Sequence, residues 1–546
     1  MSIASTFLSQ LYHLPPGEYG VRYNKNIHVK AKDGILLQTD LFQPDAPGPF
    51  PTLLMRLPYG RIGFDAVAEV YAERGFNTVL QACRGTDGSG GTFDPLGNER
   101  DDGLATLDWI KKQKWFDGRL GTTGPSYLGY AQWAICDALP EKSAMAIKVS
   151  SADFEDVVFP SGAFHLQLWL SWLQTVEGLR GAPYDIGIRI VTGDVERRSK
   201  QAAITLPLVE GDVIATGKKI PFWRRWFNEA IDNPEFWKPL DHSGRIGPDT
   251  PPVHLVSGWY DIMLDQLLAN YKAVKNAGHS PYLTIGTWTH VASELQGESI
   301  LQTLSWMRAK LMDDASALRE KPVRIHISGS KGWREFDQFP PPDIFVETLH
   351  LHAGGTLSDN PAHASNPDTY RYDPSDPTPN LGGTIFAFTG AGPRDNRKLE
   401  ARDDVLTYTS EALSAPLTII GNATVTLFAR SSLEYTDFFA RLCDVSPDGH
   451  STNICDKLIR IKPGSTKKAE DGSWCVELKL HATAHCFKKN HQLRLQISSG
   501  AHPRYARNLG TNEPLGTATK MVAADQEIFH DPAHPSLISL PVWEGS

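Results

Sequence analysis

The chain is poor in cysteine, and the spacing of its cysteines excludes several kinds of site. Six cysteines are spread over 546 residues, and none forms a C-x-x-C pair. A disulfide framework has a denser pattern in a shorter chain, and zinc or redox sites usually contain paired cysteines. We therefore expect reduced, mostly buried thiols and neither a zinc nor a redox site.

Long apolar runs and an excess of positive charge are also missing. No stretch approaches the ~20 apolar residues that a membrane span requires, so we expect no membrane partner. Lys and Arg total 54 against 63 Asp and Glu, a formal net charge of −9, so we expect no nucleic-acid partner. Residues 1–6 lack the basic start of a secretory signal, which predicts a cytoplasmic protein.

The pattern of apolar runs divides the chain into three parts. Residues 1–150 and 241–318 alternate buried-strand runs with helical stretches, which is typical of a parallel sheet covered by helices. Residues 151–240 are rich in tryptophan and leucine and predict an inserted helical cap over a pocket. In residues 319–546, beginning with a strand at 323–327, short alternating runs between turns predict a C-terminal β-sandwich or jelly roll. The fold class is therefore α/β with two additions.

One six-residue motif points to the chemistry of the protein. Gly124-Pro125-Ser126-Tyr127-Leu128-Gly129 lies between a strand-like run and a helix-like run. A serine on a tight strand-to-helix turn exposes its Oγ at the edge of a sheet, and flanking glycines prevent collisions in the turned backbone. The second glycine comes one residue later than in the usual G-x-S-x-G pattern, and an ordinary turn is the alternative interpretation.

Two later segments contain the partners that a nucleophilic serine needs. The run from Val253 to Asp261 resembles a strand followed by an acid, and the run from Tyr282 to His290 resembles the next strand followed by a histidine. The order Ser, Asp, His, each after a strand, is that of α/β-hydrolases. The alternative interpretations are a helix cap for Asp261 and a surface residue for His290. Because open α/β sheets bind ligands at one edge, we predict that Ser126, Asp261 and His290 meet there.

Further motifs accompany these residues along nearly the whole chain. They are Arg56-Leu57-Pro58-Tyr59, Cys83-Arg84-Gly85, Trp115-Phe116-Asp117-Gly118, Gly258-Trp259-Tyr260-Asp261, Gly286-Thr287-Trp288-Thr289-His290 and His502-Pro503-Arg504. With the serine motif, this set resembles the CocE/NonD hydrolases, which are related to the X-Pro dipeptidyl-peptidases. The resemblance implies an α/β-hydrolase core, no metal and no organic cofactor.

The resemblance also implies a role for each site residue. Ser126 would be the nucleophile, His290 the base and Asp261 the acid that orients the base. The oxyanion hole would consist of the backbone N–H of Tyr127 and the hydroxyl of Tyr59. A half-buried aromatic residue after a turn is the alternative for Tyr59.

The expected substrate follows from what stands beside Asp261. Family members that hydrolyse aminoacyl esters carry a Glu-Asp pair just after this aspartate, whereas Ile262 and Met263 stand here. Apolar side chains cannot hold an ammonium group, which argues against an aminoacyl or X-Pro substrate. Trp169, Trp172 and Trp259 are candidates for lining a pocket for a neutral, apolar or aromatic acyl group, with helix packing as the alternative.

We therefore predict a serine hydrolase that cleaves a small-molecule ester or amide through an acyl-enzyme. An acyltransferase with the same Ser-His-Asp residues in a biosynthetic pathway is the first alternative, because the two activities differ in the exclusion of water rather than in sequence. X-Pro dipeptidyl-peptidase-like activity is the second. A non-catalytic binding protein that uses the C-terminal sandwich is a third. A homodimer is left open.

Overall fold

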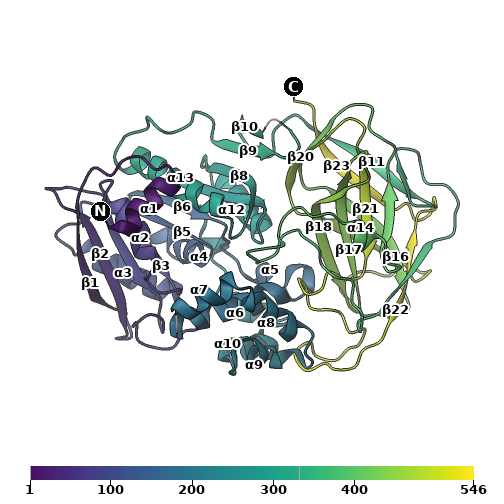
Figure 1. Ribbon diagram of the computed structural model, residues 1–546, viewed down its shortest axis with the longest axis horizontal. Helices are drawn as coiled ribbons and strands as arrows, with labels where there is room; N and C mark the ends of the chain where they lie inside the picture. The colour runs from purple at the N-terminus through teal and green to yellow at the C-terminus, as the bar shows by residue number, and fades with distance from the viewer. Residues whose placement is uncertain (1, 182, 331, 546) are drawn as a thin grey trace.

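The computed structural model describes residues 2–181, 183–330 and 332–545. Within these ranges the chain forms a ten-stranded sheet in its N-terminal part and a thirteen-stranded sheet in its C-terminal part. Figure 1 shows the two parts side by side, with a group of helices below the first sheet. Across the described ranges, no helix combines the length and the apolar character that a membrane crossing demands.

The ten-stranded sheet contains the predicted parallel core. Its order is β1-β2-β4-β3-β5-β6-β7-β8-β9-β10, and neighbouring strands from β4 to β9 pair in parallel. Strands β3 and β7 are buried along their whole length, which explains their continuous apolar character. The strands are β1 Val21–Lys30, β2 Leu36–Pro44, β3 Thr52–Leu57, β4 Asn77–Ala82, β5 Arg119–Pro125, β6 Lys142–Lys148, β7 Val253–Tyr260, β8 Tyr282–Thr289, β9 Val323–Ile327 and β10 Gly332–Phe336.

Helices cover both faces of this sheet and a further group of helices is inserted between β6 and β7. The sheet helices are α1 Ile3–Leu11, α2 Phe64–Ala72, α3 Glu99–Lys111, α4 Tyr127–Trp133, α12 Leu264–Asn276 and α13 Ser293–Leu311. The inserted segment is helical, as predicted, and consists mainly of α5 Glu155–Val158, α6 Leu166–Gly181, α7 Pro183–Val191, α8 Asp194–Ala203, α9 Gly211–Thr216, α10 Pro221–Arg225 and α11 Pro234–Trp237. Its aromatic side chains share one core cluster with Tyr127 and Tyr130 of α4. The insertion therefore packs on the helix that follows Ser126.

The assignment of residues 323–327 to the C-terminal sandwich is wrong. Strand β9 pairs in parallel with β8, from Leu283 beside Val323 to Ile285 beside Ile325, and β10 extends the same sheet. The two faces of β9 alternate between buried and half-buried, and a sandwich strand produces the same alternation in sequence. The first sheet therefore extends past residue 318, and the other two predicted boundaries stay predictions.

The C-terminal part is a domain of mostly antiparallel strands, and its jelly-roll topology stays a prediction. Its inward-facing side chains form a continuous apolar core. The elements are β11 Ile344–His352, β12 Thr356–Ser358, β13 Asp368–Tyr372, α14 Arg397–Glu400, β14 Leu406–Thr409, β15 Leu417–Gly421, β16 Thr424–Ser431, β17 Thr436–Val445, β18 Ser451–Ile461, β19 Trp474–Lys479, β20 Thr483–Phe487, β21 Gln492–Ser498, β22 Ala524–Phe529 and β23 Leu537–Trp543.

A buried ion cluster connects this domain to the helical insertion. Asp456 on β18 accepts hydrogen bonds from Arg441 at 2.9 Å and from Arg504 at 2.5 Å, and all three side chains are buried. The carbonyl oxygen of Arg504 accepts a hydrogen bond from the N–H of Gln167 on α6 at 3.3 Å. Burial acts to raise the pKa of Asp456, but the two guanidinium groups outweigh burial and hold it well below its usual range. The carboxylate therefore stays charged at neutral pH.

Replacing this carboxylate should destabilise the protein strongly. We expect Asp456→Asn to lower the free energy of unfolding by about 3–5 kcal/mol, because it leaves two buried guanidinium groups without a counter-charge. Urea unfolding at pH 7 measures this change. Asp395→Asn, which breaks a more exposed pair with Arg397, is the matched control and should have a much smaller effect. Equal effects would show that the buried cluster is not a stabilising element.

Candidate active site

Ser126 lies on the turn between β5 and α4, in a strained backbone conformation. Its φ of 57° and ψ of −122° lie outside the favourable regions for a residue with a side chain, at a cost of about 1–3 kcal/mol. The turn is tightly packed: a Cβ at Gly124 would lie 2.4 Å from the Cβ of Leu128, and one at Gly129 would lie 2.4 Å from the Cβ of Ser150. The Ser126 N–H donates to the carbonyl of Lys148 on β6 at 2.8 Å. The motif is thus a strand-to-helix turn attached to the sheet.

His290 and Asp261 approach Ser126 from the ends of two neighbouring strands. His290 follows β8, and its Nε2 lies 3.1 Å from the Ser126 Oγ. Its Nδ1 lies 2.6 Å from Oδ1 of Asp261, which follows β7. Asp261 is fully buried, and its side chain makes no capping bond to α12. The structure therefore brings together the three residues predicted from the sequence, in the geometry that a serine nucleophile, a base and an orienting acid require.

Ser257 holds the second oxygen of the Asp261 carboxylate. Its hydroxyl donates to Oδ2 at 2.8 Å from a fully buried position on β7. Because Oδ1 faces Nδ1 of His290, this ring nitrogen carries the proton and Nε2 is free to accept one. The sequence analysis missed Ser257, since a serine within an apolar strand gives no signal for its partner.

Tyr59 follows β3, and its hydroxyl lies beside Ser126. The indole Nε1 of Trp172 donates to the Tyr59 hydroxyl at 3.1 Å, so the hydroxyl keeps its own proton for another acceptor. Burial raises the pKa of Tyr59 to about 12, and the hydrogen bond from Trp172 offsets only part of this rise. The phenol is therefore a protonated donor at neutral pH.

Tyr127 is the first residue of α4, so its backbone N–H has no carbonyl partner within the helix. Its side chain points into a buried polar network. The hydroxyl donates to Glu99 at 2.9 Å and accepts from the N–H of Leu96 at 2.9 Å. Glu99 in turn pairs with Arg56 on β3 at 3.0 Å, with both side chains buried. This network fixes Tyr127 and explains why Arg56 precedes Tyr59 in the sequence motif.

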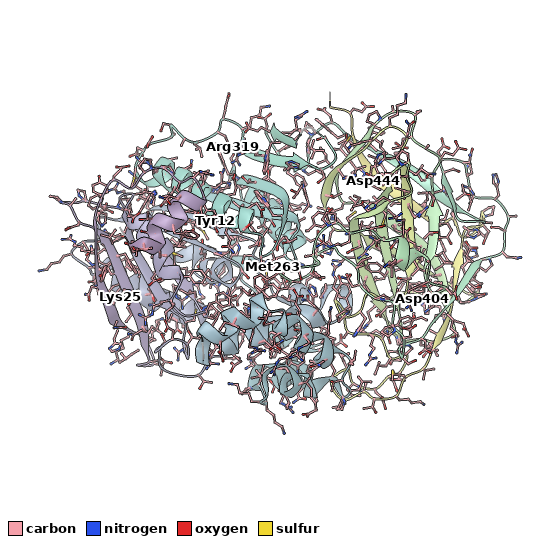
Figure 2. All side chains as sticks on the ribbon, viewed as in Figure 1. Tyr12, Lys25, Met263, Arg319, Asp404 and Asp444 are labelled. Carbon is pink, nitrogen blue, oxygen red and sulfur yellow. The ribbon has the colours of Figure 1, made fainter. Side chains whose placement is uncertain are left out.

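Two cavities meet at Ser126 and His290. The smaller is narrow, with a volume of about 10 Å³, and is apolar and aromatic; its other lining residues are Tyr59, Pro95, Leu96, Tyr127, Phe154, Leu168, Trp169, Trp172, Ile262, Met263 and Phe386. Trp172 stacks on Tyr127 with ring centroids 6.4 Å apart, and Trp169 meets Trp172 edge-on at 5.4 Å. Trp169 and Trp172 thus line the cavity as predicted. Figure 2 shows Met263 near the middle of the molecule, where the two parts meet.

Trp259 does not line either cavity, and its prediction as a substrate-binding residue is wrong. Its indole N–H donates to the carbonyl of His326 on β9 at 2.7 Å, and its ring packs against Phe339. Its position next to the Asp261 loop gave no information about the direction of its side chain.

Phe386 is a site residue that the sequence analysis missed. It comes from the C-terminal domain and lines both cavities, with its ring 5.5 Å from the His290 ring. Its backbone is held by Gln167 on α6, whose amide accepts from the Phe386 N–H at 3.1 Å and donates to the Phe386 carbonyl at 2.5 Å. Among the described residues, no group of three or more His, Cys, Asp or Glu is arranged to hold a metal ion.

The Trp172 indole should affect turnover through Tyr59. Trp172→Phe keeps an aromatic ring but removes the donor to the Tyr59 hydroxyl, so we expect kcat for an aryl ester to fall about 3–10-fold, the equivalent of one neutral hydrogen bond. Trp169→Phe is the matched control, because the indole N–H of Trp169 has no partner among the described residues. We expect Trp169→Phe to act mainly on KM. Equal losses of kcat in both variants would contradict this role of Trp172.

Two family comparisons match most of the chain. The family described as X-Pro dipeptidyl-peptidase (S15 family) matches residues 33–292, and the X-Pro dipeptidyl-peptidase C-terminal non-catalytic domain matches residues 316–539. Cocaine esterase from Rhodococcus sp. (strain MB1 Bresler) is 32% identical, in an alignment that covers 96% of this chain and 99% of that protein. The similarity therefore includes both sheets and the helical insertion.

Solved structures share the same fold. An α-amino acid ester hydrolase superposes with a TM-score of 0.79 at 22% identity, covering 97% of this chain and 98% of the other. A CocE/NonD family hydrolase from Staphylococcus aureus superposes with a TM-score of 0.69 at 16% identity, covering 95% and 93%. Together with the full-length similarity to cocaine esterase, the fold confirms the family predicted from the motifs. The chain belongs to the CocE/NonD family of serine esterases, related to the X-Pro dipeptidyl-peptidases.

Proposed function

We propose that the protein hydrolyses a small-molecule ester through an acyl-enzyme on Ser126, with His290 as the base and Asp261 as the acid that orients it. The observation that carries this proposal is the pair of contacts from His290, 3.1 Å to Ser126 and 2.6 Å to Asp261. The name of the relative cocaine esterase favours an ester over an amide.

Each half of the reaction includes two proton transfers through His290. As the Ser126 Oγ attacks the carbonyl carbon, Nε2 takes the hydroxyl proton, and the Asp261 carboxylate stabilises the imidazolium. The imidazolium then gives this proton to the leaving oxygen while the ester C–O bond breaks. Water attacks the acyl-enzyme in the same way and loses its proton to Nε2. The acid is released and Ser126 regains its proton, so the enzyme is unchanged.

The oxyanion is stabilised by two donors in this proposal. The first donor is the Tyr59 hydroxyl, which accepts a hydrogen bond from Trp172. The second is the backbone N–H of Tyr127, which is fixed at the start of α4. Prepositioned donors of this kind contribute about 3–4 kcal/mol each to lowering the barrier, since they need no rearrangement as charge develops. The raised pKa of Tyr59 supports its role, because a phenolate would repel the oxyanion.

The acyl group lies at the aromatic side chains that line the smaller cavity, and these side chains must move apart to admit it; it is neutral, apolar or aromatic. Aromatic and aliphatic side chains dominate the lining, and no acidic side chain contributes to it among the described residues. An ammonium group in these surroundings would lose its hydration without gaining a counter-charge. This argues against aminoacyl esters and against X-Pro dipeptides as substrates.

Removing the nucleophile tests the proposal directly. We expect Ser126→Ala to abolish labelling by a fluorophosphonate probe and to lower aryl-ester turnover by roughly 10⁴-fold or more, while the thermal unfolding midpoint stays the same. Ser316→Ala, which changes an exposed serine that lines neither cavity, should keep both the labelling and the turnover of the parent enzyme. Undiminished labelling of Ser126→Ala would refute the proposal. A competing alcohol in the assay distinguishes an acyltransferase, which would yield the transferred ester as its main product.

The oxyanion role of Tyr59 is tested separately. Tyr59→Phe removes one donor and preserves the ring, so we expect kcat to fall about 10²–10³-fold with a smaller change in KM, because the interaction forms fully only in the transition state. Steady-state kinetics on an aryl ester measure both constants. A Tyr59→Phe enzyme with the kcat of the parent would contradict this role.

A further inference from the structure

The larger cavity starts at Ser126 and His290 and continues in a different direction from the smaller cavity. It has a volume of about 290 Å³ and lies between the sheet, α2, α6 and α13. Val67 and Tyr71 of α2, Leu295 and Ile300 of α13, and Leu179 of α6 are among the lining side chains. Most of this lining is apolar, and no acidic side chain belongs to it among the described residues. One cation, Lys148, nevertheless lies in its wall.

Lys148 is a buried amino group without a counter-charge, and it is only partly protonated at neutral pH. It is the last residue of β6, only 3% of its surface is exposed, and its Nζ donates to Oγ1 of Thr123 at 3.1 Å. No carboxylate within salt-bridge distance of this Nζ occurs in the part of the chain that the structure describes. An ammonium has three donors, and buried charges in proteins are normally paired. Burial lowers the pKa of Lys148 to about 7.

The lysine and the nucleophile belong to one site. The carbonyl of Lys148 accepts the Ser126 N–H at 2.8 Å, and both residues line the larger cavity. A ligand group at the Lys148 ammonium is therefore in the same chamber as the ester bond under attack. An unpaired cation in an apolar wall attracts a carboxylate strongly, because the pair is shielded from water and its hydrogen bonds are charge-assisted.

The position of His290 indicates which part of the substrate lies in this cavity. The leaving oxygen must lie within reach of Nε2, since it receives its proton from there. Beyond His290, the larger cavity continues along Val291, Leu295 and Gln296, whereas the smaller cavity continues toward Trp169 and Ile262. With the acyl group at the aromatic side chains of the smaller cavity, the alcohol part extends into the larger one, toward Lys148.

We infer that Lys148 binds a carboxylate on the alcohol part of the substrate, so that the preferred substrates are esters of hydroxy acids. The inference rests on the proposed function of Ser126 and His290. In the first half-reaction the bond from Oγ to the acyl carbon forms and the ester C–O bond breaks. The hydroxy acid leaves with the proton from His290, and its carboxylate is unchanged.

The test uses benzoate esters of ω-hydroxy acids with two to five methylene groups. Each is paired with a neutral ester in which an isopropyl group replaces the carboxylate. We expect Lys148→Met to lower kcat/KM for the carboxylate ester about 10–100-fold more than for its neutral partner at one or more chain lengths, the range for a charged hydrogen bond. Lys142→Met, at the exposed start of the same strand, is the matched control and should change neither value.

Two results would overturn the inference. One is that Lys148→Met lowers kcat/KM equally for both members of every pair. The other is that Lys148→Met lowers kcat/KM only for esters that carry the carboxylate on their acyl part, such as half-esters of dicarboxylic acids. Failure of the proposed function looks different, because the wild-type protein would then hydrolyse none of the esters, and Ser126 would not react with a fluorophosphonate.

A measurement on the wild-type protein covers the case in which Lys148→Met does not fold. The free ω-hydroxy acids should inhibit hydrolysis at least 10-fold more strongly than alcohols of equal length in which an isopropyl group replaces the carboxylate. Because deprotonation of Lys148 removes the charge, this ratio should fall as the pH rises through about 7. Other titratable groups near the cavity are Tyr59, Tyr71, His254 and His290. Because a protonated His290 would also favour the carboxylate, the two compounds are compared again by direct binding to His290→Gln, in which the fall of the ratio through about pH 7 should persist. A ratio near one at all pH values would overturn the inference.

Discussion

The parallel pairing of β5, β6, β7 and β8 is the constraint on which the site depends. Each strand ends at the same edge of the sheet, and the next residues are the ones that meet there: Ser126 after β5, Asp261 after β7 and His290 after β8. The Ser126 N–H bonded to the Lys148 carbonyl continues this pairing into the strained turn. The sheet register thus sets distances between side chains that lie up to 164 positions apart in the chain.

Around this edge, buried side chains position one another in layers. Ser257 orients Asp261, Trp172 leaves the Tyr59 proton free, and Glu99 with Arg56 anchors Tyr127. Each of these contacts pairs a polar or charged group with a buried or half-buried partner, which restricts the side-chain conformations around the site. Preorganisation of this kind is what electrostatic stabilisation of an oxyanion requires.

How far the sequence predicts this site depends on the range of each interaction. Buried-strand runs followed by Ser126, Asp261 and His290 are local patterns, so the fold class and the meeting of these residues were predictable. Ser257 and Phe386 were not, since their roles come from contacts with distant residues. The errors at Trp259 and at 323–327 have the same origin: the direction of a side chain and the partner of an edge strand are decided by packing, and alternating burial is common to both kinds of sheet.

Phe386 gives the C-terminal domain a direct part in the chamber. The ring that packs against His290 comes from a domain that contains none of Ser126, Asp261 and His290. Gln167 of the helical insertion holds the backbone of Phe386 through the oxygen and the nitrogen of its side-chain amide. Undocking that domain by a few ångströms would open both cavities to solvent at once. Access to Ser126 therefore depends on how closely the N-terminal and C-terminal parts pack. A substitution in the interface between them, even one distant from Ser126, can alter turnover.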